Sequence, residues 1–423
     1  GDVYKRQVLK LNTSNIAEQF TSYDLLGIKI DGTNDLDFLK IKAILNQDKS
    51  FNKISLKDEI AQGCEEDMLR FNAVVGNPPY QENIGSQVNK SLSKQLYPSF
   101  IMLAVKMLPE YLTMITPSRW FTGNAQDRSF VRLRDFMRSN NHISNIVNYL
   151  NSSDVFEGVS VPGGVNYFLY KKGYSGNISF KEISKNNTTV VKRPLFEQGL
   201  DIVLPINRMI SILRKVTSST FQSMEAIVTG RNPFGIPATN AALNRITSDT
   251  QDSKHDTKIL CAYEQIKFIS NTAITRNKEL SKNWKVFTSK MNGGAGTLLD
   301  EKAVSILGRT FVMGPDSICS NTLLAIGGFK QQYKAKNLNK YMNTKFFRCM
   351  LGIKKVAQVL TSNIYQYVPQ QDFTKNSDIN WQKSIPEIDI QLYAKYNLAP
   401  KEIDYIESKI KPAFLSDSVL FLN

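Results

Sequence analysis

The stretch that decides the fold of this 423-residue chain reads Phe71-Asn72-Ala73-Val74-Val75-Gly76-Asn77-Pro78-Pro79-Tyr80. Residues 71–75 are mostly apolar and β-branched near their end, which predicts a short buried strand that stops at Gly76. The next four residues predict a stiff loop, because each proline fixes its own φ and keeps the preceding residue out of the α region. An amide, a proline carbonyl and an aromatic ring are therefore expected at the carboxyl end of a strand, where open α/β sheets bind their ligands.

The side chains of this loop suit methylation of an amino nitrogen conjugated to a ring. Such a nitrogen is a poor nucleophile, because its lone pair is delocalised into the ring. The Asn77 side-chain oxygen and the Pro78 carbonyl can each accept a hydrogen bond from this amino group, which localises the lone pair. The Tyr80 ring can stack on a base flipped out of a duplex. The methyl donor would be a sulfonium, so we expect positioning and electrostatics to matter more than a strong base.

At these residues the chain resembles the adenine-N6 DNA methyltransferases of restriction–modification systems, in particular the large ones that carry their own target-recognition domain. The Asn/Asp-Pro-Pro-Tyr/Phe motif of that family matches Asn77, Pro78, Pro79 and Tyr80 without a departure. The resemblance implies a Rossmann-like α/β domain that binds S-adenosylmethionine, followed by a mixed α+β domain that recognises double-stranded DNA. It also implies a restriction nuclease as a partner, either fused to the chain or separate.

Two other interpretations stay open at this point. Glutamine-N5 protein methyltransferases and some RNA guanine methyltransferases use a similar loop, although the glutamine-modifying chains are usually shorter and have no large basic C-terminal domain. The second alternative is a DNA-binding specificity fragment without catalysis.

The distribution of charge differs between the two halves of the chain. Residues 1–200 carry 24 Lys and Arg against 20 Asp and Glu, a net +4, whereas residues 201–423 carry 29 against 18, a net +11. The excess is expected where a domain holds a phosphate backbone. The length predicts two domains, and we place a catalytic domain over 8–190, a target-recognition domain over 191–412 and a tail over 413–423.

The cysteines and the apolar runs indicate the cellular setting. The four cysteines are far apart and no pair has metal-ligand spacing, so we predict free thiols and no metal site. No apolar run reaches the length of a membrane span, and no signal peptide is visible. These features predict a cytoplasmic protein without a membrane partner.

The first residues depart from the family pattern. Residues 1–7 are similar to the translated end of a transposon-based sequencing adapter, so we expect them to be foreign. The family's glycine-rich cofactor loop should lie before residue 20, where no Gly-x-Gly occurs. We therefore expect an N-terminal truncation, a sheet that lacks its first strand and keeps an unpaired edge, and weak helical character over 8–20.

Apolar periodicity predicts strands over 23–30, 53–56, 111–116, 143–150 and 165–171, and helices over 36–45, 95–108 and 129–138. The strand–helix–strand order favours a mainly parallel sheet, with a polar mobile loop over 81–93. The resemblance implies that acids at strand ends hold the cofactor's adenosine, and Asp31 and Asp58 are the nearest matches. It also implies that Phe156 lies against the flipped base.

The second half of the chain shows a less regular pattern. Basic and aromatic residues interleave in three segments, Lys345-Phe346-Phe347-Arg348, Lys354-Lys355 and Tyr365-Gln366-Tyr367. This mixture favours phosphate contact and base stacking, although aromatics at such spacings are more often part of a core. The glycine-bearing loops 229–235 and 291–296 also contain or adjoin basic residues. Residues 388–410 are expected to be mostly helical, with a break near Pro400.

Overall fold

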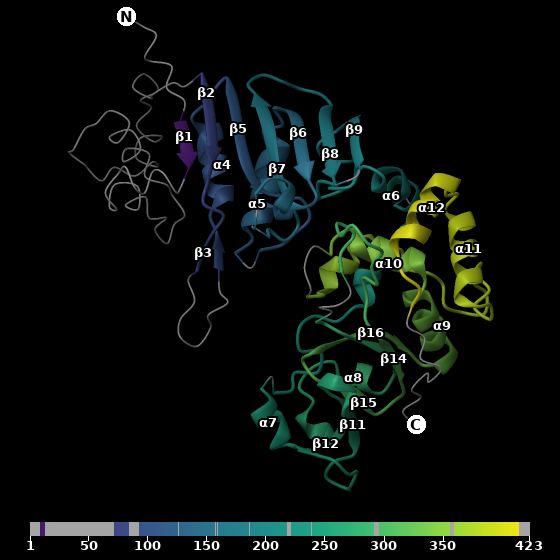
Figure 1. The fold of residues 1–423 in the computed structure, drawn as a ribbon. Helices are drawn as coiled ribbons and strands as arrows, with labels where there is room; N and C mark the ends of the chain where they lie inside the picture. The colour runs from purple at the N-terminus through teal and green to yellow at the C-terminus, as the bar shows by residue number, and fades with distance from the viewer. Residues whose placement is uncertain are drawn as a thin grey trace, which may run out of the picture. The chain divides into compact units, whose positions relative to one another are not determined.

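The computed structural model describes residues 9–12, 72–83, 93–125, 127–156, 158, 160–185, 187–217, 221–237, 239–291, 296–355 and 359–413. The strands expected over 23–30 and 53–56 and the helix expected over 36–45 lie outside this part of the chain. The chain divides into two compact units, residues 1–207 and residues 208–423 (Figure 1). Strand β9, Asn187–Arg193, crosses the boundary that we predicted after residue 190, and it pairs with its neighbour in the first unit.

Within the described residues, the first unit is built on a seven-stranded mixed sheet. Its strands, in spatial order, are β1 (Leu9–Asn12), β2 (Ala73–Asn77), β5 (Tyr111–Pro117), β7 (Val165–Lys171), β6 (Ile143–Tyr149), β8 (Ile178–Ser184) and β9. Strands β7 and β9 run antiparallel to their neighbours, and the other pairs are parallel. The expectation of a mainly parallel sheet is therefore met only in part, because the sheet is mixed. Even so, β1, β2, β5, β6 and β8 share one direction, so their carboxyl ends meet at one edge.

Strand β1 corrects two predictions about the start of the chain. It pairs in parallel with β2, from Leu9 opposite Val74 to Asn12 opposite Asn77. Helical character was therefore the wrong prediction for these four residues. The alternation in Leu9-Lys10-Leu11 has the period of a strand, and β2 offers hydrogen-bonding groups along its free side. Because β2 has β1 on one side and β5 on the other, the unpaired edge that we expected beside it is absent.

The segment after β2 also differs from the prediction. Strands β3 (Gln81–Asn83) and β4 (Ser93–Gln95) pair antiparallel where a mobile loop was expected. Helix α4 (Tyr97–Lys106) then begins two residues later than predicted, with Pro98 in its first turn, where a missing N–H costs nothing. Helix α5 (Ser129–Ser139) packs against α4. Both contribute to one apolar core with the inward residues of the sheet.

Among its described residues, the second unit contains two smaller sheets and a group of helices. The first sheet has the order β10 (Thr247–Ser248), β12 (Ile266–Ile269), β11 (Thr257–Leu260), β15 (Ser317–Cys319), and the second has the order β14 (Thr310–Met313), β13 (Trp284–Ser289), β16 (Leu323–Phe329). The helices are α6 (Met209–Val216), α7 (Asn240–Asn244), α8 (Lys278–Ser281), α9 (Gln332–Met342), α10 (Lys345–Gly352), α11 (Ile385–Lys395) and α12 (Pro400–Lys409). Residues of both sheets share one apolar core. Together with the first unit, this is a mixed α/β fold with several sheets.

The helical prediction for residues 388–410 is confirmed, including its break. Helix α11 ends at Lys395 and α12 starts at Pro400. A capping box starts α11, since the Ser384 N–H donates to the Glu387 carboxylate over 2.9 Å. Of the helices in the described part of the chain, none combines the length and the apolar character that a membrane span requires.

Candidate functional site

The loop Asn77-Pro78-Pro79-Tyr80 leaves the sheet at the carboxyl end of β2. Asn77 is the last residue of the strand, Pro78 is buried, and Pro79 and Tyr80 are half-buried. The far end of the loop is also held, because the Leu96 N–H donates to the Tyr80 carbonyl over 3.1 Å. The loop is therefore fixed by the sheet on one side and by the start of α4 on the other.

The ring of Tyr80 has a defined environment. It meets the ring of Tyr97 at an interplanar angle of 77°, with centroids 6.4 Å apart, and Tyr97 in turn packs on Phe130 at 5.8 Å. The Tyr80 hydroxyl has no hydrogen-bond partner among the described residues. Burial raises the pKa of Tyr80 to about 12, so the ring stays uncharged at neutral pH.

A buried polar network forms the neighbouring wall of this edge. Strand β5 ends at Pro117 and continues into the 3-10 turn η2 (Ser118–Trp120). The Ser118 hydroxyl donates to Asn148 Oδ1 over 2.6 Å, and Asn166 Nδ2 donates to Ser118 Oγ over 3.2 Å. These three side chains come from the ends of β5, β6 and β7, and all are buried. The network therefore ties together three strands at the edge that carries Asn77.

Gly164 closes the same wall. Its carbonyl accepts the Ser118 N–H over 2.9 Å. Its φ is +79°, and a Cβ at this position would lie 2.2 Å from the Tyr149 carbonyl oxygen. Only glycine fits both the backbone conformation and the space.

The structure adds Arg134 to the residues that shape the site. This buried side chain of α5 donates to the carbonyls of Trp120 over 2.7 Å and Gly123 over 2.8 Å. It thereby holds the turn that follows β5. The sequence analysis predicted a helix over 129–138 and gave this arginine no role. The available signal was a cation on the apolar face, four residues after Phe130 and flanked by Leu133.

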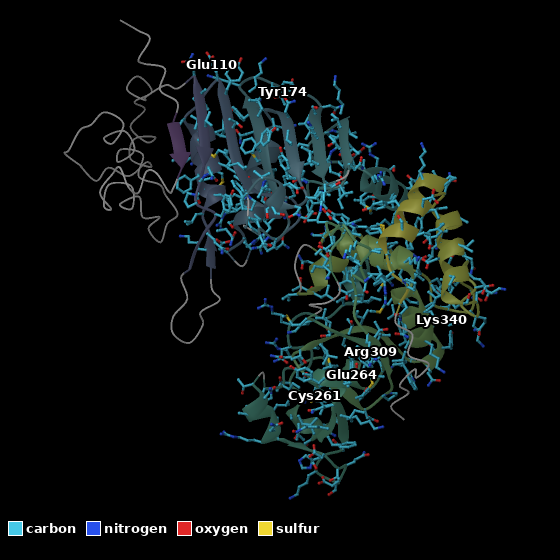
Figure 2. The ribbon with its side chains drawn as sticks, viewed as in Figure 1. Glu110, Tyr174, Cys261, Glu264, Arg309 and Lys340 are labelled. Atoms are coloured by element: carbon cyan, nitrogen blue, oxygen red, sulfur yellow. The ribbon has the colours of Figure 1, made fainter. Side chains whose placement is uncertain are left out.

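The other predicted site residues have different outcomes. Phe156 follows β6 and is half-buried, and its N–H donates to the Ser152 carbonyl over 2.9 Å. Because β6 and β2 point the same way, Phe156 lies at the same edge as Tyr80, but no ring contact joins the two. Glu110 and Tyr174 mark the opposite edge (Figure 2). The predicted cofactor-binding residues Asp31 and Asp58 lie outside the described residues.

The basic and aromatic segments of the second unit do not form the predicted contact surface. Their side chains are buried, with exposed fractions of at most 4%, at Phe346, Phe347, Arg348, Lys354, Lys355, Tyr365 and Tyr367. The cations bind internal oxygens: Lys355 donates to the Gly296 carbonyl and Arg348 to Asn343 Oδ1. The prediction that these segments contact phosphates and stack on bases was therefore wrong. In the part of the chain that the structure describes, no group of three His, Cys, Asp or Glu could hold a metal ion.

Comparisons with known proteins agree with the motif. Residues 4–156 match the model of the Eco57I restriction-modification methylase family, a match that starts within the seven residues predicted to be foreign. An uncharacterized adenine-specific methylase of Mycoplasma pneumoniae is 30% identical over 176 residues, which are 40% of this chain and 41% of that protein. The chain thus spans about two fifths of the length of this curated relative. The predicted resemblance to restriction–modification adenine methylases is confirmed over the matched part.

Two solved structures are similar at low identity. The type IIG restriction endonuclease BpuSI is 14% identical with a TM-score of 0.30, over 80% of this chain and 52% of that one. The type IIL restriction-modification enzyme MmeI, solved in complex with DNA, is 10% identical with a TM-score of 0.43, over 89% of this chain and 61% of that one.

Proposed function

We propose that this chain transfers a methyl group from S-adenosylmethionine to N6 of adenine in double-stranded DNA, as part of a restriction–modification system. The observation that carries the proposal is the Asn77-Pro78-Pro79-Tyr80 loop, anchored at the carboxyl end of β2 with its aromatic ring held against Tyr97. The family match over residues 4–156 supports it, as does the relative named as an adenine-specific methylase.

The loop acts on the amino group of a flipped adenine. Asn77 Oδ1 and the Pro78 carbonyl each accept a hydrogen bond from this amino group. The two hydrogen bonds localise the nitrogen lone pair and aim it at the methyl donor. Pro78 and Pro79 have no N–H that could compete for these acceptors. The uncharged ring of Tyr80 stacks on the face of the base and compensates for part of the lost stacking in the duplex.

The methyl donor is expected beside the same loop. Asn12 and Asn77 are register partners at the ends of parallel strands, so the chain leaves β1 and β2 at one edge. This arrangement fits a donor held next to the Asn77 side chain, and Asp31 and Asp58 are the acids that we expect to hold its adenosine. When bound, the sulfonium supplies an electrophilic methyl group. The protein's own contribution is to position the adenine nitrogen and to exclude water.

The second unit is proposed to recognise the DNA. The net charge of +11 over residues 201–423 favours phosphate contact, and with Lys354, Lys355 and Arg348 buried, that contact falls to other, exposed cations. A restriction nuclease, fused or separate, is the proposed functional partner, and the cytoplasm is the proposed location.

The test is to incubate the full chain with isotopically labelled S-adenosylmethionine and duplex DNA of mixed sequence, followed by mass spectrometry of the nucleosides. Labelled N6-methyladenine that depends on the chain supports the proposal. Labelled methylglutamine in an added protein substrate, with unmodified DNA, would instead support the protein methyltransferase. Calorimetric titration of S-adenosylmethionine distinguishes a methyltransferase from a non-catalytic DNA-binding chain. The second would bind DNA without binding the methyl donor.

A further inference from the structure

A strained turn in the second unit presents an exposed aromatic side chain. Residues 261–265 connect β11 to β12, and the 3-10 turn η5 (Ala262–Glu264) lies within them. Tyr263 has a φ of +57° and is 96% exposed, and Glu264 has a φ of +63°. Two consecutive left-handed residues that are not glycine are disfavoured, and such a conformation persists only where the surroundings hold it.

A bidentate ion pair holds this turn. Arg309 Nη1 donates to both carboxylate oxygens of Glu264, over 2.9 and 3.0 Å. The two residues come from the β11–β12 turn and from the position just before β14, and they lie side by side (Figure 2). The Cys261 N–H also donates to the Gln265 carbonyl over 2.7 Å. These two contacts act on the backbone of the turn, and the ring of Tyr263 projects from it into solvent, where it contacts no other described aromatic or cation.

Arg309 and Lys290 lie at the same end of the β14–β13–β16 sheet. Thr310 of β14 is opposite Thr288 of β13, so Arg309 is beside the last residue of β13, and Lys290 follows that residue. The Lys290 N–H donates to the Thr322 carbonyl over 2.9 Å, just before β16 starts. The turn that carries Tyr263 and the residue Lys290 therefore lie at the same end of the β14–β13–β16 sheet.

Arg231 reaches this edge from the other side of β16. The Thr229 N–H donates to the Ala325 carbonyl over 2.9 Å, next to the isolated antiparallel bridge between Val228 and Ile326. Arg231 follows two residues after Thr229, on the side of β16 opposite Lys290, and its side chain is exposed. Burial and the Arg231 charge both lower the pKa of Lys290, which agrees with this placement. Neither cation forms an ion pair with a described carboxylate.

We propose that this edge, made of Tyr263, Arg231 and Lys290 and called here the aromatic–cationic edge, binds the duplex DNA of the proposed function. Arg231 and Lys290 contact phosphates, and Tyr263 enters the stack as a wedge. Duplex DNA offers both closely spaced negative charges and base faces, whereas a simple anion would leave the ring unused. Because Glu264 already neutralises the charge of Arg309, we assign Arg309 to holding the turn and not to contacting a phosphate.

The test measures duplex binding by the full chain in fluorescence anisotropy at several salt concentrations, with methyl transfer followed in parallel. Tyr263→Ala is expected to weaken binding roughly tenfold without changing the salt slope, and Tyr263→Phe to restore it. The double variant Arg231→Ala/Lys290→Ala is expected to lower the slope of log K against log salt by about 2. Ile390→Ala and Lys401→Ala, at exposed residues of α11 and α12 in the same unit, serve as controls.

Unchanged affinity and slope in these variants would overturn the inference while leaving methyl transfer, and so the proposed function, intact. Equal losses in the controls would overturn it as well. Absence of duplex binding by the wild-type chain would contradict both proposals.

Discussion

The ring of Tyr80 lies edge to face with the ring of Tyr97, with 6.4 Å between the centroids. Tyr97 is fully buried at the start of α4, so the position of Tyr80 depends on the core of the first unit as well as on the two prolines. A base stacked on Tyr80 would therefore meet a surface that is in place before binding. This preorganisation reduces the entropy that base capture costs.

Replacing Tyr80 separates the role of its ring from that of its hydroxyl. Tyr80→Ala should weaken capture of a flipped base by about 1–3 kcal/mol, because the stacking surface is lost. Tyr80→Phe should stay close to wild type, because the hydroxyl has no partner among the described residues. A fluorescent base analogue at the target position reports capture. Equal losses in the two variants would argue against stacking.

Replacing Gly164 tests the wall beside the loop. Gly164→Ala should lower the free energy of unfolding by about 3 kcal/mol, because the new Cβ meets the Tyr149 carbonyl in a left-handed backbone conformation. Gly173→Ala is the matched control, since its φ is +74° and nothing lies within 4 Å of its Cβ. The control should lose only about 1 kcal/mol. Chemical denaturation measures both, and similar losses would show that the contact with Tyr149 does not matter.

The stability of the second unit should depend on pH through Asp389. Burial raises the pKa of this carboxyl from 3.8 to about 7, although the N–H groups of Phe346 and Lys345 donate to it. Between these two values the folded chain holds a proton that the unfolded chain has released. The free energy of unfolding should therefore fall as the pH rises from about 4 to about 7. Thermal unfolding of wild type and Asp389→Asn across this window measures the effect.

In Asp389→Asn this fall should be absent, and in Asp404→Asn, a change at an exposed residue of α12, it should remain. If the stability of wild type and of Asp389→Asn changed with pH in the same way, Asp389 would not be the group that causes the pH dependence.

Lys355 should contribute nothing to the salt dependence of DNA binding. Its side chain is buried and donates to the Gly296 carbonyl, and burial lowers its pKa to about 8. We expect Lys355→Met to leave the slope of log K against log salt as it is in the wild type. A decrease of about 1 would show that Lys355 reaches a phosphate.

The parts of the fold that sequence predicted are those where the local pattern decides the structure. Strand 165–171 was predicted with the bounds that it has, and the break before Pro400 follows from proline stereochemistry. The pairing of β3 with β4 was missed, because each strand has three polar residues and is too short to show an alternating apolar pattern. Strand β1 was missed because four residues are too few for a period to be distinguished from a helical one.

The functional residues divide in the same way into those that the sequence could predict and those that it could not. The loop Asn77–Tyr80 could be recognised because its residue types impose both geometry and chemistry. Lys355 and Lys290 look alike in sequence, yet one is buried and the other is only partly so, because tertiary packing decides which cation meets solvent. Tyr263 carried no signal either, since tyrosine is not a residue that favours a left-handed turn.

The central claim is that Asn77 binds the amino group of the target adenine. The measurement that tests it is methyl transfer by Asn77→Ala in the full chain, with duplex affinity measured on the same preparation. We predict that N6-methyladenine formation is abolished while duplex binding stays close to wild type, because Asn77 contacts the base and phosphate contacts supply most of the affinity. Methylation at a near-normal rate by Asn77→Ala would contradict the account.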